Sequence, residues 1–192
     1  MKYLAHLKLP QQCNELLDVY RAEIAPYITE LPGSGSHITL FSGRFDLEHE
    51  SNLISELKHI KSSSFSLSLE DTFDIYDRNR LVLKVRPSIP LHLLHLDIIE
   101  HMQSYLNWTE IPAIPPLYAS DTQRRKVYEQ YGSPYVERFY SPHLSLCSIT
   151  PTCRTLPVPE RLARYSWSVD SFFLYRKNTR WEEVERFELS GE

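Results

Sequence analysis

The sequence has few glycines and no long apolar segment. Its 5 glycines among 192 residues include no glycine-rich loop of the kind that cradles phosphate groups with backbone amides. No apolar run approaches the roughly 18 residues needed to cross a bilayer. The N-terminal residues 1–6 lack the apolar core and the small-residue cleavage site of a secretory signal. The chain therefore offers no sign of a phosphate-binding glycine loop, a membrane span or secretion.

Cysteine is also scarce. The three cysteines, Cys13, Cys147 and Cys153, are odd in number and contain no Cys-x-x-Cys pair. This pattern is typical of free thiols in a reducing compartment, and a Cys147–Cys153 disulfide is the alternative. We therefore expect a cytoplasmic protein.

The chain carries no excess of positive charge, since its formal net charge is −4 at pH 7. Strong non-specific binding to a nucleic-acid backbone is therefore not expected, because that binding depends on clustered lysines and arginines. A small nucleotide or an RNA end remains a suitable partner, since a few local cations are enough to hold it. The length fits a single domain spanning residues 1–192, and we expect a monomer.

A four-residue pattern occurs twice in the sequence. Each copy consists of a histidine, an aliphatic residue, a hydroxyl residue and a leucine, and each follows a stretch of residues that break regular structure. The two copies are His37-Ile38-Thr39-Leu40 and His143-Leu144-Ser145-Leu146.

Both copies begin apolar runs that are typical of strands. Because successive side chains of a strand point to opposite faces, each histidine shares a face with the hydroxyl residue two positions later. Two such strands facing each other would line one cleft with His37, Thr39, His143 and Ser145. These are suitable groups for chemistry on a phosphodiester. The alternative is two ordinary strands, each with a polar residue at its edge.

The other histidines give weaker signals. His49 and Ser51 repeat the spacing, but they lie in a segment with helical periodicity. His92 and His95 could bind a metal from one helix, but the cysteine or histidine set of a zinc site is missing. We expect these two to lie on a solvated helix flank, and we expect no metal and no other cofactor.

Periodicity predicts an α+β order of elements. Predicted helices cover residues 11–28, a segment after Asp46 and a segment from Pro90, with at most a short helix at 157–164. Predicted strands cover residues 3–9, 36–42, a strand pair within 65–85, 142–149, 165–175 and 181–189.

Residues 107–141 break the pattern, with four prolines, several tyrosines and the run Gln123-Arg124-Arg125-Lys126. A loop this long without a clear period is typical of a lid or binding loop. Its aromatic residues could stack on a base and its arginines could hold a phosphate. Equally, it could be a packed excursion whose aromatic side chains fill surface gaps.

On its two histidine motifs and its element order, the chain resembles the 2H phosphoesterase superfamily, named for two His-x-Thr/Ser motifs. Residues 131–136 resemble a branch associated with phosphonate metabolism, whereas residues 175–177 and 181–184 resemble the cyclic phosphodiesterases. The resemblance implies a bilobal α+β fold, in which two pseudo-symmetric antiparallel sheets with outer helices surround a central cleft. It also implies chemistry that needs no metal.

From these observations we expect a phosphodiesterase that acts on 2′,3′-cyclic phosphates or on 2′-5′ or 3′-end RNA phosphodiesters. Histidine can give or take a proton near neutral pH. We assign His143 as the base and His37 as the acid, with the Thr39 and Ser145 hydroxyls donating to the phosphate. Candidate substrate contacts are His6, Tyr135, Tyr175 and Arg176. The alternatives are a non-catalytic module that binds a nucleotide or RNA end, and a phosphoesterase of the phosphonate-associated branch.

Overall fold

A computed structural model describes residues 1–33, 35–76, 79–150 and 156–189. The strands are β1 (Lys2–Lys8), β2 (Ile28–Glu30), β3 (His37–Arg44), β4 (Phe65–Tyr76), β5 (Arg80–Val85), β6 (His143–Ile149), β7 (Ser166–Val169), β8 (Ser171–Lys177) and β9 (Trp181–Glu188). The α-helices are α1 (Gln11–Glu23), α2 (Glu50–Leu57), α3 (Ile89–Met102), α4 (Pro116–Ala119) and α5 (Thr122–Tyr131). The predicted α+β class is confirmed.

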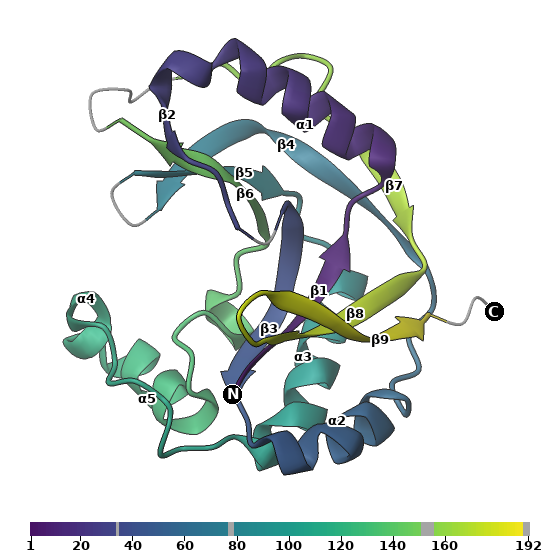
Figure 1. The fold of residues 1–192 in the computed structure, drawn as a ribbon, viewed down its shortest axis with the longest axis vertical. Helices are drawn as coiled ribbons and strands as arrows, with labels where there is room; N and C mark the ends of the chain where they lie inside the picture. The colour runs from purple at the N-terminus through teal and green to yellow at the C-terminus, as the bar shows by residue number, and fades with distance from the viewer. Residues whose placement is uncertain (34, 77–78, 151–155, 190–192) are drawn as a thin grey trace.

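The strands form one strongly curled antiparallel sheet (Figure 1). Within the described residues its order is β7-β4-β5-β6-β3-β1-β8-β9, and β2 also pairs with β6. Strands β7 and β8 lie far apart in this order, yet only Asp170 separates them in the chain. The sheet must therefore curl until its two ends approach each other.

The curled sheet consists of two halves that meet at a narrow seam. Strands β3 and β6 carry the two histidine motifs, and they pair only through Ile38 and Leu144. On one side of the seam lie β7, β4, β5 and β6, and on the other lie β3, β1, β8 and β9. This arrangement agrees with the expected two-lobed fold, with the difference that the two sheets are joined at the seam.

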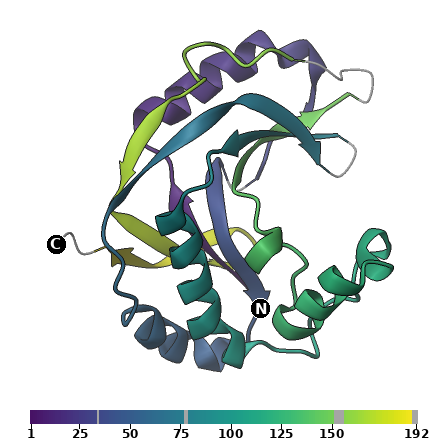
Figure 2. The same cartoon turned by 180° about the vertical axis from the view of Figure 1, so that it is seen from behind.

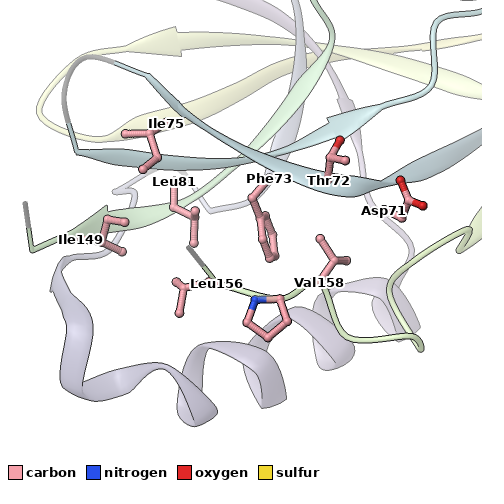
Figure 3. A pocket seen from close by; sticks show the side chains of 9 residues that line it. Asp71, Thr72, Phe73, Ile75, Leu81, Ile149, Leu156 and Val158 are labelled. Carbon is pink, nitrogen blue, oxygen red and sulfur yellow. The ribbon is translucent and has the colours of Figure 1, made fainter. Parts of the chain in front are cut away.

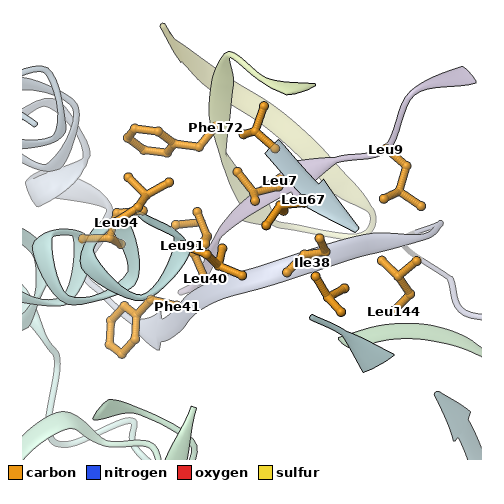
Figure 4. Packing of buried hydrophobic residues seen from close by; sticks show 14 of the residues in the cluster. Leu7, Leu9, Ile38, Leu40, Phe41, Leu67, Leu91, Leu94, Leu144 and Phe172 are labelled. Carbon is orange, nitrogen blue, oxygen red and sulfur yellow. The ribbon is translucent and has the colours of Figure 1, made fainter. Parts of the chain in front are cut away.

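Each half has its own helical cover, as two opposite views show (Figures 1 and 2). Helix α1 packs on the β4 side, where Tyr20 stacks on Phe73 with ring centroids 5.3 Å apart. Helices α2 and α3 cover the half that contains β3. The buried side chains form one continuous core through both halves, and part of it is drawn in Figure 4. Because Ile38 and Leu144 belong to this core, burial of the aliphatic motif positions holds the polar positions on the opposite face.

Two predicted elements end differently from expectation. Helix α1 ends at Glu23 rather than near residue 28, because Pro26 cannot continue a helix and restricts the residue before it. The strand predicted at 165–175 is divided at Asp170 into β7, which pairs with β4, and β8, which pairs with β1 and β9. Alternation of apolar residues continues through this break, so the sequence pattern does not reveal it.

The stretch 107–141 is not the irregular loop that its composition indicates. It contains α4 and α5, and Asp121 caps α5 by accepting hydrogen bonds from the amides of Gln123 and Arg124. Helix α5 ends at Gly132, whose φ of +65° favours glycine. Only Val127 and Tyr131 of α5 are buried, which leaves too few apolar positions for a visible helical period.

Among the described residues, no helix combines the length and apolarity required to cross a bilayer. Cys13 and Cys147 are buried. Cys153 lies outside the described residues, and so does the alternative Cys147–Cys153 disulfide.

Candidate active site

The structure brings the four polar residues of the two motifs to one pocket. His37 and Thr39 from β3, and His143 and Ser145 from β6, all line a cavity of about 330 Å³. Residues that are far apart in the sequence therefore share one solvent-accessible site. This is the juxtaposition that the repeated motif predicted.

The pairing at the seam explains how the motifs meet. In an antiparallel pair, the residues flanking a directly opposed pair also face each other across the two strands. The Ile38–Leu144 pair therefore sets His37 beside Ser145 and Thr39 beside His143. Each imidazole lies next to the hydroxyl residue of the other motif.

In both motif histidines, Nδ1 forms a hydrogen bond with the backbone carbonyl of the residue two positions earlier. Nδ1 of His37 lies 3.2 Å from the carbonyl oxygen of Gly35, and Nδ1 of His143 lies 2.8 Å from that of Ser141. A carbonyl oxygen can only accept, so Nδ1 must carry the proton in both rings. In the neutral form, Nε2 of each ring then carries the lone pair and is the atom that can take up a proton.

An aromatic ring supports each of the two imidazoles. The ring of His6 lies 4.8 Å from that of His37 at an interplanar angle of 30°. The ring of Tyr76 lies 4.8 Å from that of His143 in an edge-on arrangement, and the Tyr76 hydroxyl hydrogen-bonds with the Ser141 hydroxyl at 3.1 Å. These contacts limit rotation of both imidazoles.

His6, one of the candidate substrate contacts, is deeply buried beside the first motif. It lies opposite Thr39 in the β1–β3 pair and stacks between His37 and Tyr175. Neither ring nitrogen has a hydrogen-bond partner among the residues that the structure describes, and only 4% of the residue is exposed. Burial, together with His37 and Lys8, lowers the pKa of His6 to about 3. His6 is therefore neutral near pH 7 and supports His37 through ring contact.

Burial also lowers the pKa of His37, and the nearby His143 lowers it further, while the hydrogen bond to Gly35 acts in the opposite direction. Neutral His37 is thus favoured in the free protein. A neutral imidazole with its lone pair on Nε2 is suited to act as a base.

A second buried histidine connects the two motif strands, although His95 was expected on a solvated flank. His95 is fully buried on α3, and its Nδ1 lies 2.6 Å from the carbonyl oxygen of Leu40. Its Nε2 accepts a hydrogen bond from the amide of Glu137 at 3.0 Å. Tyr140 stacks on the His95 ring at 3.8 Å and donates its hydroxyl hydrogen to the carbonyl oxygen of Thr39 at 3.1 Å. His92, one turn earlier, is exposed as expected.

Arg21 of α1 forms another connection between the motifs. Its Nε donates to the carbonyl oxygen of Leu146 at 3.1 Å, and another guanidinium nitrogen donates to the hydroxyl of Ser36. Asp18 neutralises the guanidinium at 2.8 Å. One arginine therefore holds the residue before His37 and the end of the second motif together.

None of the four candidate substrate contacts, His6, Tyr135, Tyr175 and Arg176, is among the residues that line the pocket. Arg176 is held by Glu50 at 2.8 Å and Glu182 at 3.3 Å. Tyr175 stacks on His6 and donates its hydroxyl hydrogen to Glu183. Tyr135, within the 107–141 stretch, donates its hydroxyl hydrogen to the hydroxyl of Tyr118.

Two further features lie apart from the motifs. An apolar cavity of about 300 Å³ lies between the curled sheet and α1, and Phe73, Leu81 and Val158 are among its lining residues (Figure 3). Within the described residues, Asp46, Glu48 and His49 form a group whose potential metal-ligand atoms lie within 4.8 Å of one another. Neither feature includes a residue of the repeated motifs.

The pocket also contains residues that the sequence analysis did not select. Lys2, Arg80 and Trp181 line it together with the motif residues. They come from β1, β5 and β9, which have no common sequence pattern. Only the pairing of these strands could have identified them.

The fold is shared with several solved structures, among them E. coli LigT and a protein described as a phosphoesterase. It matches E. coli LigT complexed with 3′-AMP with a TM-score of 0.68 and 18% identity, over 98% of each chain. TT0787 of Thermus thermophilus matches with a TM-score of 0.70 and 18% identity, over the full length of both chains. Usb1 of Kluyveromyces marxianus matches with a TM-score of 0.52 and 12% identity, over 98% of this chain and 96% of that one. By sequence, no protein-family model and no curated protein matches this chain.

Proposed function

We propose that this protein is a 2H phosphoesterase that hydrolyses 2′,3′-cyclic phosphates, or 2′-5′ or 3′-end RNA phosphodiesters, without a metal ion. The observation that carries the proposal is the pair of imidazoles in one pocket, each with Nδ1 bound to a backbone carbonyl. With Nδ1 protonated, Nε2 is the proton-transfer atom of each ring, and the two rings line the same pocket.

In the proposed reaction, water attacks phosphorus and the bond to the leaving ribose oxygen breaks. One imidazole takes the proton of the attacking water, and the other gives a proton to the leaving oxygen. The lowered pKa of His37 describes the free protein, and a bound phosphate anion favours the protonated ring that an acid needs. We therefore keep the roles assigned from the sequence, with His143 as the base and His37 as the acid. The two rings return to their starting states by proton exchange with solvent.

Thr39 and Ser145 are proposed to donate hydrogen bonds to the non-bridging phosphate oxygens. Each hydroxyl residue lies beside the histidine of the other motif, as the pairing of Ile38 with Leu144 requires. Donors fixed before the reaction stabilise the charge that develops on the phosphoryl oxygens. His6 and Tyr175 are proposed to act through His37 rather than by touching the substrate.

The comparisons support a nucleotide as the ligand. Structures of E. coli LigT with 3′-AMP and with ATP share this fold. We propose by analogy that a nucleotide or RNA end occupies the pocket of this chain.

We also propose that the chain acts as one domain, residues 1–192, and as a cytoplasmic monomer, with 107–141 serving as a lid-like insertion. The continuous core supports a single domain. Burial raises the pKa of the Cys13 thiol to about 11, so this thiol resists oxidation and is compatible with a reducing compartment.

The test is a hydrolysis screen in EDTA over 2′,3′-cyclic nucleotides, 2′-5′ dinucleotides and RNA with a terminal 3′ phosphodiester. We expect turnover of at least one class, with a bell-shaped pH–rate profile, and a loss of about 10² or more in His37→Ala and in His143→Ala. The His37→Ala/His143→Ala double variant is the blank. Binding without turnover in every class would instead identify a nucleotide-binding module, and activity that EDTA abolishes would contradict the metal-free scheme.

A further inference from the structure

A row of like charges crosses the sheet at the edge of the pocket. Lys2 of β1 is directly opposite Arg44 of β3 on one side and Lys177 of β8 on the other. Lys177 is in turn opposite Trp181 of β9. Directly opposed residues of neighbouring strands project from the same face, so the three cations lie side by side.

The positive charges of this row are not neutralised by ion pairs within the described residues. In the described part of the chain, none of Lys2, Arg44 and Lys177 forms an ion pair with a carboxylate, although the protein has more acidic than basic residues. Like charges placed directly opposite each other destabilise a sheet. Burial lowers the pKa of Lys2, and the charges of Arg44, Lys177 and Arg80 lower it further. The cluster therefore weakens the free protein, and an anion would relieve it.

One member of the row, Lys2, lines the pocket that contains the motifs, and Arg44 and Lys177 are its neighbours on either side. Lys2 and Trp181 line that pocket together with His37 and Thr39, and Arg80 approaches from the other half of the sheet. The indole of Trp181 lies 5.9 Å from Nζ of Lys2 and 5.6 Å from Nζ of Lys177, measured to the ring centroid. This contact holds both ammonium groups in place without neutralising them.

The backbone of the row lies further from the motifs than the width of one phosphate group. His6 is opposite Thr39, and Lys2 lies four residues from His6 along β1. At about 3.3 Å per residue this backbone separation is roughly 13 Å. The long side chain of Lys2 spans part of this separation, which places its ammonium group where a second phosphate of the same ligand can reach it.

We propose that Lys2, Arg44 and Lys177 form a second anion-binding subsite, so that the preferred ligand carries a further phosphate group besides the one between the histidines. The subsite rests on the proposed function and extends it, since it narrows the substrate class. Two sources supply this chemistry: a mononucleotide with a 5′-phosphate, and an oligonucleotide whose next phosphodiester reaches the row.

Binding measurements test the subsite without requiring turnover. The probes are adenosine 3′-phosphate, adenosine 3′,5′-bisphosphate and the dinucleotide ApA with a 3′-phosphate, titrated by calorimetry at low salt. We expect the wild type to bind at least one two-phosphate probe about tenfold or more tightly than adenosine 3′-phosphate. The tighter of the two probes identifies the source of the second phosphate. Screening by salt should reduce the difference.

The informative variant is Lys2→Met/Lys177→Met, which keeps the aliphatic stems and removes two charges. Its affinity ratio between two-phosphate and one-phosphate probes should fall to about one. The matched control is Lys58→Met/Lys61→Met, which removes two exposed lysines outside the pocket and should keep the wild-type ratio. A wild-type ratio near one, or an unchanged ratio in Lys2→Met/Lys177→Met, would overturn the subsite. A tenfold ratio in a protein without hydrolytic activity would leave the subsite standing and reject the phosphodiesterase.

Discussion

The carbonyl oxygen of Leu40 accepts a hydrogen bond from Nδ1 of His95 across the interface between β3 and α3. On its other side, Nε2 of His95 accepts from Glu137, whose φ of +54° is unusual for a residue other than glycine. Leu40 ends the first motif, and Glu137 precedes the second by six residues. One neutral imidazole thus fixes the approach of both motif strands to the pocket.

Replacing His95 by phenylalanine should therefore destabilise the protein. The change keeps a ring against Tyr140 but leaves the Glu137 amide and the Leu40 carbonyl without their partner, at about 2 kcal/mol or more in total. Urea unfolding measures the loss. His92→Phe, on the exposed part of the same helix, is the control and should change the free energy of unfolding by less than about 0.5 kcal/mol. Equal stability of the two variants would reject this role of His95.

The free energy of unfolding should fall as the pH drops below about 6.5, the pKa of histidine in an unfolded chain. The pKa of His95 is lowered to about 4 and that of His6 to about 3, against 6.5 for each in an unfolded chain. Between these limits the unfolded chain binds more protons than the folded one, so the free energy of unfolding rises with pH and is fully recovered above 6.5. The His95 contribution is on the order of 3 kcal/mol. Unfolding curves from pH 4 to 8 should show this slope, and His6→Phe should make it shallower. A pH-independent stability would contradict both assignments.

His6→Phe should be neutral or stabilising by about 1 kcal/mol, because it removes two buried nitrogens without hydrogen-bond partners and keeps the contact with His37. His6→Ala should instead cost about 2 kcal/mol or more, since it leaves a cavity. Thermal unfolding distinguishes these outcomes. If His6 contacted the substrate, His6→Phe would raise KM, and an increase of about tenfold would show that the ring nitrogens reach the ligand.

Removing either motif hydroxyl should lower kcat by about 10². The changes are Thr39→Val and Ser145→Ala, which keep the strand and the adjacent histidine. Thr39→Ser and Ser145→Thr retain the donor and serve as controls that should remain within a few-fold of the wild type. Steady-state kinetics on the best substrate of the hydrolysis screen measures these effects. A valine variant with wild-type kcat would exclude Thr39 as a phosphate donor.

Several elements could be predicted from the sequence because local patterns determine them. The two motif strands follow breaker residues and alternate through each motif. The ranges predicted for them, 36–42 and 142–149, lie within two residues of β3 (His37–Arg44) and β6 (His143–Ile149). The apolar anchors Ile38 and Leu144 imply which face is polar. The repeat of the motif predicted that the two histidines and two hydroxyl residues line one cleft. No periodicity in the sequence shows that β3 and β6 pair with each other.

Other parts depend on contacts between distant segments. Helix α5 has too few buried residues to show a helical period, and the break at Asp170 lies within an unbroken alternation. The burial of His95 depends on Tyr140, which comes from a stretch without a visible pattern. Lys2, Arg44 and Lys177 become neighbours only through the register in which β1 pairs with β3 and with β8, and the sequence does not show this register.

The most direct test of the account is an NMR titration of the imidazole nitrogens of His37 and His143 with adenosine 3′-phosphate. If one phosphate lies between the two rings, Nε2 of both histidines should shift on the same binding curve, and both pKa values should rise because the bound anion favours the protonated rings. His92 is exposed on α3 and should not respond. A response of only one of the two motif histidines, or two different binding curves, would contradict the claim that they act on a single phosphate.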